Sequence, residues 1–229
     1  MTPDSQPTEP QAPQSPPRTR AVIFDLDGVL VWSMPMHHTA FQRTFAAEGR
    51  EFPLDEYRQV ALGASREEVI RRVLGDLPHE KMRRLMSEKE RHVKEYLRQR
   101  GIELIPGAID FVRAVRARNV KTAVASASRI PEVILDSVGV LPLFDAVVGR
   151  GKVRRSKPHP DLYLLAAETL GVPPEECLVL EDSPTGIDAA LNAGMHVLAI
   201  TTTEDAANLS RAHGVYPGFA DISLDEWIG

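Results

Sequence analysis

The stretch AVIFDLDGV (residues 21–29) decides the fold of this chain. It opens with a short apolar run of β-branched and aromatic side chains, which is typical of a buried strand. Asp25 and Asp27 follow at positions i and i+2, so both carboxylates leave the strand on one side, and Gly28 permits a sharp turn behind them. Carboxylates this close require a proton or a hard cation to offset their repulsion. The alternative is a simple Asx-turn or helix cap after the strand.

Four more apolar runs predict strands, and helical patterns separate them. The strand candidates are KTAVAS (121–126), FDAVVG (144–149), CLVLE (177–181) and HVLAI (196–200). The helical patterns cover residues 108–118, 131–139, 161–170 and 184–192. Such alternation predicts an α/β fold, a Rossmann-like doubly wound parallel sheet. Its ligand site is expected beyond the carboxyl ends of the strands.

The chain between the first two predicted strands is far longer than a βα crossover requires. It carries four helical patterns, at residues 35–48, 55–61, 66–74 and 79–100. We therefore predict a helical cap domain over residues 35–104, inserted into a core domain of residues 19–34 and 105–229. Residues 1–18 hold six of the 18 prolines and almost no large apolar side chain, so we expect a disordered tail there.

Composition limits the classes of partner. The 229 residues carry 27 basic and 32 acidic side chains, a formal net charge of −5, which is a poor match to the phosphate backbone of nucleic acid. The single cysteine, Cys177, allows no internal disulfide and favours a reducing compartment. Neither a targeting signal nor a membrane span is visible. We expect a cytoplasmic monomer that acts on a small molecule.

Polar side chains follow three other predicted strands. Ser126 ends one run, Lys157 stands in a loop before Pro158, and Glu181 and Asp182 follow another run. Each has a plain alternative: serine suits turns, a loop lysine is commonly solvated, and acids favour a helix N-terminus. In a parallel sheet, however, all of them meet at one edge.

In their order along the chain, these motifs resemble those of the haloacid dehalogenase superfamily. DLDGV, VASAS, SKPHPD and LEDSPTGI match its four motifs, and the resemblance covers roughly residues 20–225. It implies that Asp25 is a nucleophile and that Asp27 is a general acid and base. The second aspartate, Asp27, is the residue that marks the phosphoryl-transfer members of the superfamily. Ser126, Ala127 and Lys157 would bind the transferring phosphoryl group, and Lys157 would also hold Asp25.

The same resemblance implies a metal site for Mg²⁺. Asp25 and Asp182 would be ligands together with the main-chain carbonyl of Asp27, and Glu181 would lie at or just behind the ion.

Features of the cap resemble the β-phosphoglucomutase branch of the superfamily. The residues that carry this likeness are His37, Arg66, Lys89 and Ser128, which the resemblance assigns to proton transfer or to contact with a sugar phosphate. The alternatives are a solvated helix face for His37 and for Lys89 in the charge run EKERHVKE, a surface ion pair with Glu67 or Glu68 for Arg66, and a helix cap for Ser128.

Two departures weigh against a mutase. Trp32 stands where relatives commonly have an aspartate, and Ile130 stands where the mutase has a sugar-contacting asparagine. We therefore predict a Mg²⁺-dependent phosphatase acting on a small phosphorylated metabolite, a sugar phosphate, through an aspartyl phosphate. The alternatives are a mutase that moves phosphate within a hexose phosphate and a non-catalytic module that binds phosphometabolites.

Overall fold

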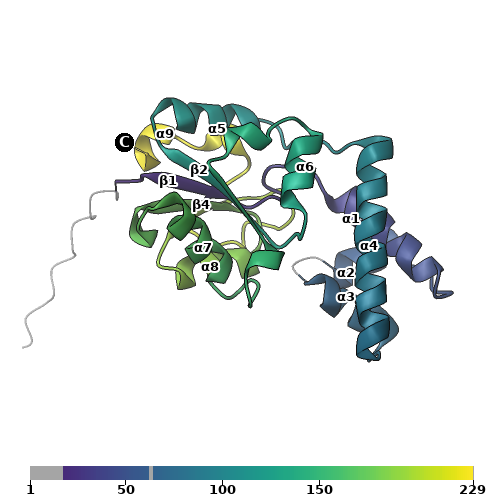
Figure 1. Ribbon diagram of the computed structural model, residues 1–229. Coiled ribbons are helices and arrows are strands. Elements are labelled where there is room, and N and C mark those ends of the chain that lie inside the picture. Colours follow the sequence, from purple (N-terminus) through teal and green to yellow (C-terminus); the bar gives the residue numbers. More distant parts are fainter. Residues whose placement is uncertain (1–17, 62–63, 229) are drawn as a thin grey trace, which may run out of the picture.

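The computed structural model describes residues 18–61 and 64–228, and within them six strands form one parallel sheet. The strand order is β3-β2-β1-β4-β5-β6 (Figure 1). The strands are β1 Ala21–Phe24, β2 Lys121–Ser126, β3 Ala146–Gly149, β4 Cys177–Glu181, β5 His196–Ile200 and β6 Gly214–Tyr216. The predicted Rossmann-like α/β fold is thereby confirmed. The predicted tail lies outside the described residues except for Arg18.

Alternate residues of the central strand β1 enter two different cores. Val22 and Phe24 belong to one apolar cluster, whereas Ala21 and Ile23 belong to another. The first cluster lies under α5 (Ala108–Ala117), α6 (Pro131–Ser137) and α9 (Leu224–Trp227), and the second under α7 (Asp161–Leu170) and α8 (Pro184–Asn192). Figure 1 shows α5 and α9 on one side of the sheet and α7 and α8 on the other. Both faces are covered, which explains the nearly uninterrupted apolar runs of the strands.

Four of the five described helices between β1 and β2 form a separate group, and α5 is the fifth. The four are α1 (Met34–Ala46), α2 (Leu54–Val60), α3 (Arg66–Leu74) and α4 (His79–Arg100). They stand beside the sheet domain in Figure 1. Their own apolar cluster includes Phe45, Phe52, Ile70 and Leu85. We call residues 34–100 the helical insert.

The chain enters and leaves the helical insert through two segments that pair with each other. The amide of Trp32 donates to the carbonyl of Glu103 at 2.8 Å, and the amide of Ile105 donates to the carbonyl of Leu30 at 2.9 Å. Both connections therefore lie next to each other, and Met36 and Ala40 of α1 and Val93 and Leu97 of α4 also join the apolar cluster that holds Phe24 of the sheet.

Short 3₁₀ turns complete the chain at Leu141–Leu143, Arg150–Lys152, Pro174–Glu176 and Phe219–Asp221. Among the described residues, no helix is at once long enough and apolar enough to pass through a bilayer.

Candidate active site

The site lies where the strands end and the helical insert begins. A cleft of about 580 Å³ separates the carboxyl edge of the sheet from the insert. The predicted residues that line it are Asp25, Asp27, His37, Arg66, Ala127, Ser128, Lys157, Asp182 and Lys89. Sequence-distant residues therefore meet around one cavity, as a parallel sheet requires.

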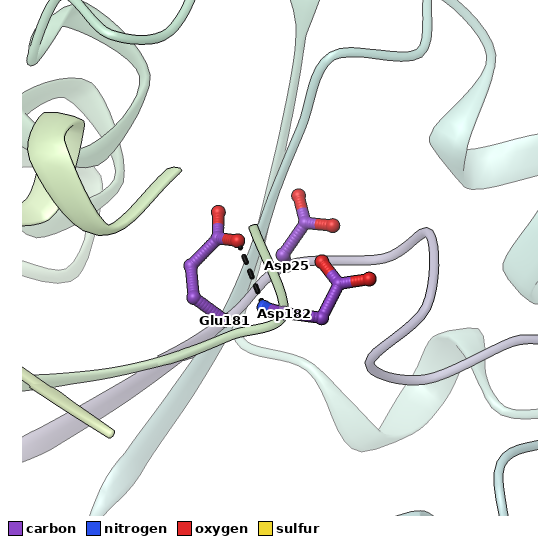
Figure 2. Close-up of side chains that lie close together, drawn as sticks. All are labelled: Asp25, Glu181 and Asp182. Atoms are coloured by element: carbon purple, nitrogen blue, oxygen red, sulfur yellow. Dashed lines mark hydrogen bonds between the residues drawn. The ribbon is translucent and has the colours of Figure 1, made fainter. Parts of the chain in front are cut away.

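Three buried carboxylates form the centre of the site. Asp25, Glu181 and Asp182 each offer one oxygen, and these oxygens all lie within 4.8 Å of one another. Figure 2 shows the three side chains together, with the amide of Asp182 donating to Glu181 Oε2 at 3.0 Å. Asp25 follows β1, Glu181 ends β4, and these two strands are hydrogen-bonded neighbours.

Lys157 is the counter-ion of this group. Its Nζ donates to Asp25 Oδ1, and also to Glu181 Oε1 at 2.6 Å. Glu181 Oε1 receives a further hydrogen bond from the Tyr163 hydroxyl at 2.6 Å, and Oε2 receives one from the Ser183 hydroxyl at 3.0 Å. Because protein donors occupy both of its oxygens, Glu181 mainly holds Lys157 in place.

The charges of this group are unbalanced, with three carboxylates against one ammonium. Burial raises the pKa of Asp25 to about 7, with Glu181 adding to the rise and Lys157 opposing it. Burial, Glu181 and Asp25 raise the pKa of Asp182 well above its usual range. Burial alone would lower the pKa of Lys157, but the two carboxylates that it contacts hold it high. A hard divalent cation would remove the repulsion, and carboxylate oxygens are the donors it prefers. The donor set therefore fits such an ion.

Gly28 lets the turn after β1 pass close to this centre. Its φ is +83°, in the left-handed region that favours glycine. A Cβ added to Gly28 would lie 1.9 Å from Asp182 Oδ2, so the fourth residue of DLDGV has no room for a side chain.

Asp27 lies outside the carboxylate group and faces the helical insert. Its Oδ1 is 3.0 Å from His37 Nε2, and His37 Nδ1 is 2.9 Å from Lys89 Nζ. Burial would raise the pKa of Asp27, but the charge and hydrogen bond of His37 hold it at about 2. The side-chain contacts Asp27–His37 and His37–Lys89 thus link the DLDGV turn to the helical insert.

Lys89 is buried, so the interpretation of its charge run as a solvated helix face is wrong at this position. Only 7% of the residue is exposed, and its Nζ lies 5.0 Å from the centre of the Phe41 ring. Burial, together with the charge of Arg66, lowers the pKa of Lys89 to about 7. Neighbours in the run do face solvent, as Lys94 does.

The phosphate-binding candidates lie behind the end of β2. Ser126 is fully buried, and its hydroxyl accepts the amide of Ser128 at 3.0 Å. The Ser128 hydroxyl accepts the amide of Ile130 at 3.2 Å, but Ile130 is itself the N-cap of α6 and no side chain caps this helix, so the helix-cap alternative for Ser128 is wrong. Ala127 and Ser128 line the cleft.

Arg66 faces the cleft from the first turn of α3. Ser65 caps this helix and forms a capping box with Glu68. Arg66 Nη1 donates to the carbonyl of Met86 at 3.1 Å and lies 3.6 Å from Glu90 Oε2. The helix start thus holds a cation over the cavity.

The motif analysis missed three residues that contact the carboxylates or their turn. Tyr163 reaches Glu181 from α7, while Thr202 and Thr203 follow β5 and contact Gly28 and Asp182. The run TTT (201–203) at the end of a predicted strand was the available signal, whereas Tyr163 is indistinguishable from a core residue of its helix.

Comparisons with known proteins agree with this geometry. A family model described as haloacid dehalogenase-like hydrolase matches residues 19–194. The chain therefore belongs to this hydrolase family, as the order of its four motifs predicted, and the prediction of an enzyme is confirmed.

Relatives in the family carry both phosphatase and mutase names. Hexitol phosphatase A of Escherichia coli (strain K12) is 29% identical over 219 residues, covering 90% of this chain and 94% of that protein. β-Phosphoglucomutase of Bacillus subtilis (strain 168) is 32% identical over 189 residues, covering 79% and 83%. The crystal structure of CbbY from Rhodobacter sphaeroides in complex with phosphate matches with a TM-score of 0.80 at 29% identity, covering 89% of this chain and 96% of that one.

Proposed function

We propose that this protein hydrolyses the phosphate monoester of a sugar or polyol in a Mg²⁺-dependent reaction. The observation that carries the proposal is the convergence of Asp25, Lys157 and Asp182 at the edge of a cleft that also holds cations of the insert. A relative named hexitol phosphatase and a similar structure that contains phosphate support the substrate class.

The reaction proceeds in two displacements at phosphorus. A carboxylate oxygen of Asp25 attacks the phosphoryl group, the bond to the alcohol oxygen breaks, and Asp27 donates a proton to that oxygen. A water molecule then attacks the aspartyl phosphate and gives a proton to Asp27, which releases inorganic phosphate and restores Asp25. The ammonium of Lys157 offsets the charge on the phosphoryl oxygens, and Ser126 and Ala127 help to hold them.

Asp27 has to be protonated before the first displacement. In the free protein His37 Nε2 lies 3.0 Å from Asp27 Oδ1 and lowers the pKa of Asp27 to about 2, so the proton has to arrive when the anionic phosphate monoester binds nearby and raises that pKa. His37, with Lys89 at its other ring nitrogen, holds the carboxyl group of Asp27 in place for this step. These contacts support the roles assigned to His37 and Lys89.

Mg²⁺ would be held by Asp25, Asp182 and the main-chain carbonyl of Asp27, with Glu181 behind them, and would add charge stabilisation at the phosphoryl group. Binding of the ion also relieves the repulsion among the buried carboxylates.

We assign residues 35–104 as a cap over a core of residues 19–34 and 105–229. A cap over the cleft excludes bulk water and lets its own side chains select the substrate. Arg66, Lys89 and Ser128 are the selecting residues in this assignment, since the two cations favour an anionic substrate.

The second candidate is a mutase that transfers phosphate between two positions of a hexose phosphate. The His37–Asp27 contact favours it, because an acid held next to an imidazole can serve a sugar hydroxyl as well as water. The half-buried apolar side chains of Trp32 and Ile130, which line the cleft, favour the phosphatase, because neither can accept the hydrogen bonds of a sugar hydroxyl.

The test measures two products from one set of substrates. Hexose, pentose and hexitol phosphates are incubated with the protein and Mg²⁺, and both free phosphate and isomerised sugar phosphate are quantified, with a hexose bisphosphate added as a primer. We expect phosphate release from at least one sugar or polyol phosphate. Asp25→Asn should abolish release, and Asp136→Asn, on the exposed surface of α6, should leave it unchanged.

Isomerisation without released phosphate would establish the mutase instead. Phosphate release that persists in Asp25→Asn would remove the covalent mechanism, and release that persists after complete removal of divalent ions would remove the role of Mg²⁺.

A further inference from the structure

The loop after β5 contacts Asp182 of the carboxylate centre and the turn after β1. β4 and β5 are parallel neighbours, with Glu181 paired to Ala199, so the residues that follow the two strands lie next to each other. Asp182 follows β4, and Thr201, Thr202 and Thr203 follow β5. Two of these threonines make side-chain contacts with the site.

Thr203 holds Asp182. Its hydroxyl lies 2.6 Å from Asp182 Oδ2 and 3.1 Å from the main-chain oxygen of the same residue. A hydroxyl at this distance donates to one carboxylate oxygen, which fixes the rotation of the carboxylate and leaves its second oxygen available. Thr203 also lines the cleft.

Thr202 holds the turn that faces Asp182. Its hydroxyl donates to the carbonyl of Gly28 at 2.5 Å. A Cβ on Gly28 would lie 1.9 Å from Asp182 Oδ2 and 2.9 Å from the Cγ2 of Thr203. The consecutive residues Thr202 and Thr203 therefore form hydrogen bonds to Gly28 and Asp182, which face each other closely where β1 and β4 end.

We propose that Thr203 is a positioning residue that sets the affinity of this protein for Mg²⁺ by holding the carboxylate of Asp182 in its ligating orientation. Thr202 keeps the Gly28 turn against the same loop. The inference rests on the proposed function in one respect, that a divalent cation binds between Asp25 and Asp182.

The experiment titrates the full-length protein with Mg²⁺ by calorimetry in the absence of substrate. Removing the partner of a metal ligand typically costs about 10- to 100-fold in metal affinity, so Thr203→Val should weaken Mg²⁺ binding by that factor. Thr203→Ser keeps the hydroxyl and should bind within about threefold of the original protein. Thr201→Val is the matched control, because among the described residues the Thr201 side chain makes no hydrogen bond, and it should bind Mg²⁺ unchanged.

A positioning role is separated from a folding defect by two further measurements. The midpoint of unfolding in EDTA measures the part of the loss that does not require the ion, and Thr203→Val should remain fully folded at the temperature of the titration, so that its weaker Mg²⁺ binding is a property of the folded protein. In the phosphatase assay, Thr203→Val should raise the Mg²⁺ concentration that gives half-maximal rate, while the KM for substrate at saturating Mg²⁺ stays the same.

Equal Mg²⁺ affinity of Thr203→Val and the original protein would overturn the proposal, and so would a failure of Thr203→Ser to restore binding. A different result, an original protein that binds no Mg²⁺ and needs none for phosphate release, would defeat the cation assignment in the proposed function and with it this inference.

Discussion

Replacing Gly186 by alanine is expected to destabilise the protein, although the position lies in a helix. Alanine is favoured over glycine in a helix interior by about 1 kcal/mol, and Gly186 belongs to α8. However, a Cβ at this position would lie 1.8 Å from Glu181 Oε1. Ordinary van der Waals contact begins at 3.4 Å, so the carboxylate has to retreat by the difference, 3.4 − 1.8 = 1.6 Å.

Glu181 has nowhere to retreat without losing its partners. It is fully buried, and its Oε1 accepts hydrogen bonds of 2.6 Å from both Lys157 and Tyr163. Overpacking of a core costs about 1–3 kcal/mol, and the loss of a hydrogen bond to a charged group costs about 1.5–3 kcal/mol. Against the gain in helix propensity, the net loss is about 1.5–5 kcal/mol.

Thermal unfolding in EDTA measures this balance. For a chain of this size the loss lowers the midpoint by roughly 3–20 °C, and displacement of Lys157 should reduce the rate of phosphate release by about 100-fold. Gly151→Ala is the control, because a Cβ there would meet nothing within 4 Å, and it should change neither quantity. A Gly186→Ala protein that melts at or above the original temperature would refute the reasoning.

Three further outcomes are expected. Lys89→Met should lower kcat by about 10- to 100-fold with unchanged Mg²⁺ affinity, because His37 loses the partner 2.9 Å from its Nδ1. The control is Lys81→Met near the start of α4, whose half-buried side chain pairs with Glu48 and does not line the cleft, and it should leave kcat unchanged. Loss of Mg²⁺ binding in Lys89→Met would contradict this. In the double variant Asp25→Asn, Trp227→Phe, Trp32 is the one remaining tryptophan of two. Because Trp32 lines the cleft, its fluorescence emission should change when a sugar phosphate that the original protein hydrolyses binds there. An unchanged spectrum at a saturating concentration would place the ligand elsewhere. Burial raises the pKa of Cys177 to about 12, so its thiol stays protonated at pH 8. Iodoacetamide should therefore label Cys177 only after unfolding. Rapid labelling of the folded protein would show instead that β4 opens.

The strands were predictable because their sequences are simple. KTAVAS, CLVLE and HVLAI are apolar runs that end in polar or turn residues, and the structure begins and ends β2, β4 and β5 at the same residues. The edge strand β6 was missed because its three residues, GVY, are all half-exposed and have no apolar run around them.

The meeting of the four motifs followed from topology, whereas the contacts among the side chains did not. Parallel strands place their carboxyl ends at one edge, and this alone brings Asp25 close to Asp182. Whether Lys89 faces water or the cleft depends on which side of α4 packs against α1. Because α4 carries charged residues on most of its sides, its sequence does not indicate which side is buried. Tyr163 reaches Glu181 through the packing of α7 on the sheet, which is a tertiary property.

Burial of the three carboxylates destabilises the folded state, and other interactions of the fold have to offset this free energy. Bringing charged groups out of water costs several kcal/mol per ion even when they are paired, and here three buried carboxylates share the single ammonium of Lys157, which contacts two of them. Three features of the chain reduce the cost: the amides of Asp182 and Ser183 donate to Glu181 Oε2 at 3.0 and 3.2 Å, α8 directs its positive N-terminal end toward the group, and Thr203 donates to Asp182. None of these three donors reaches Asp25, which lines the cleft together with Asp182. The donors therefore compensate Glu181 and Asp182, and the proposed cation would add to the positive charge that Asp25 receives, among the described residues, from Lys157 alone.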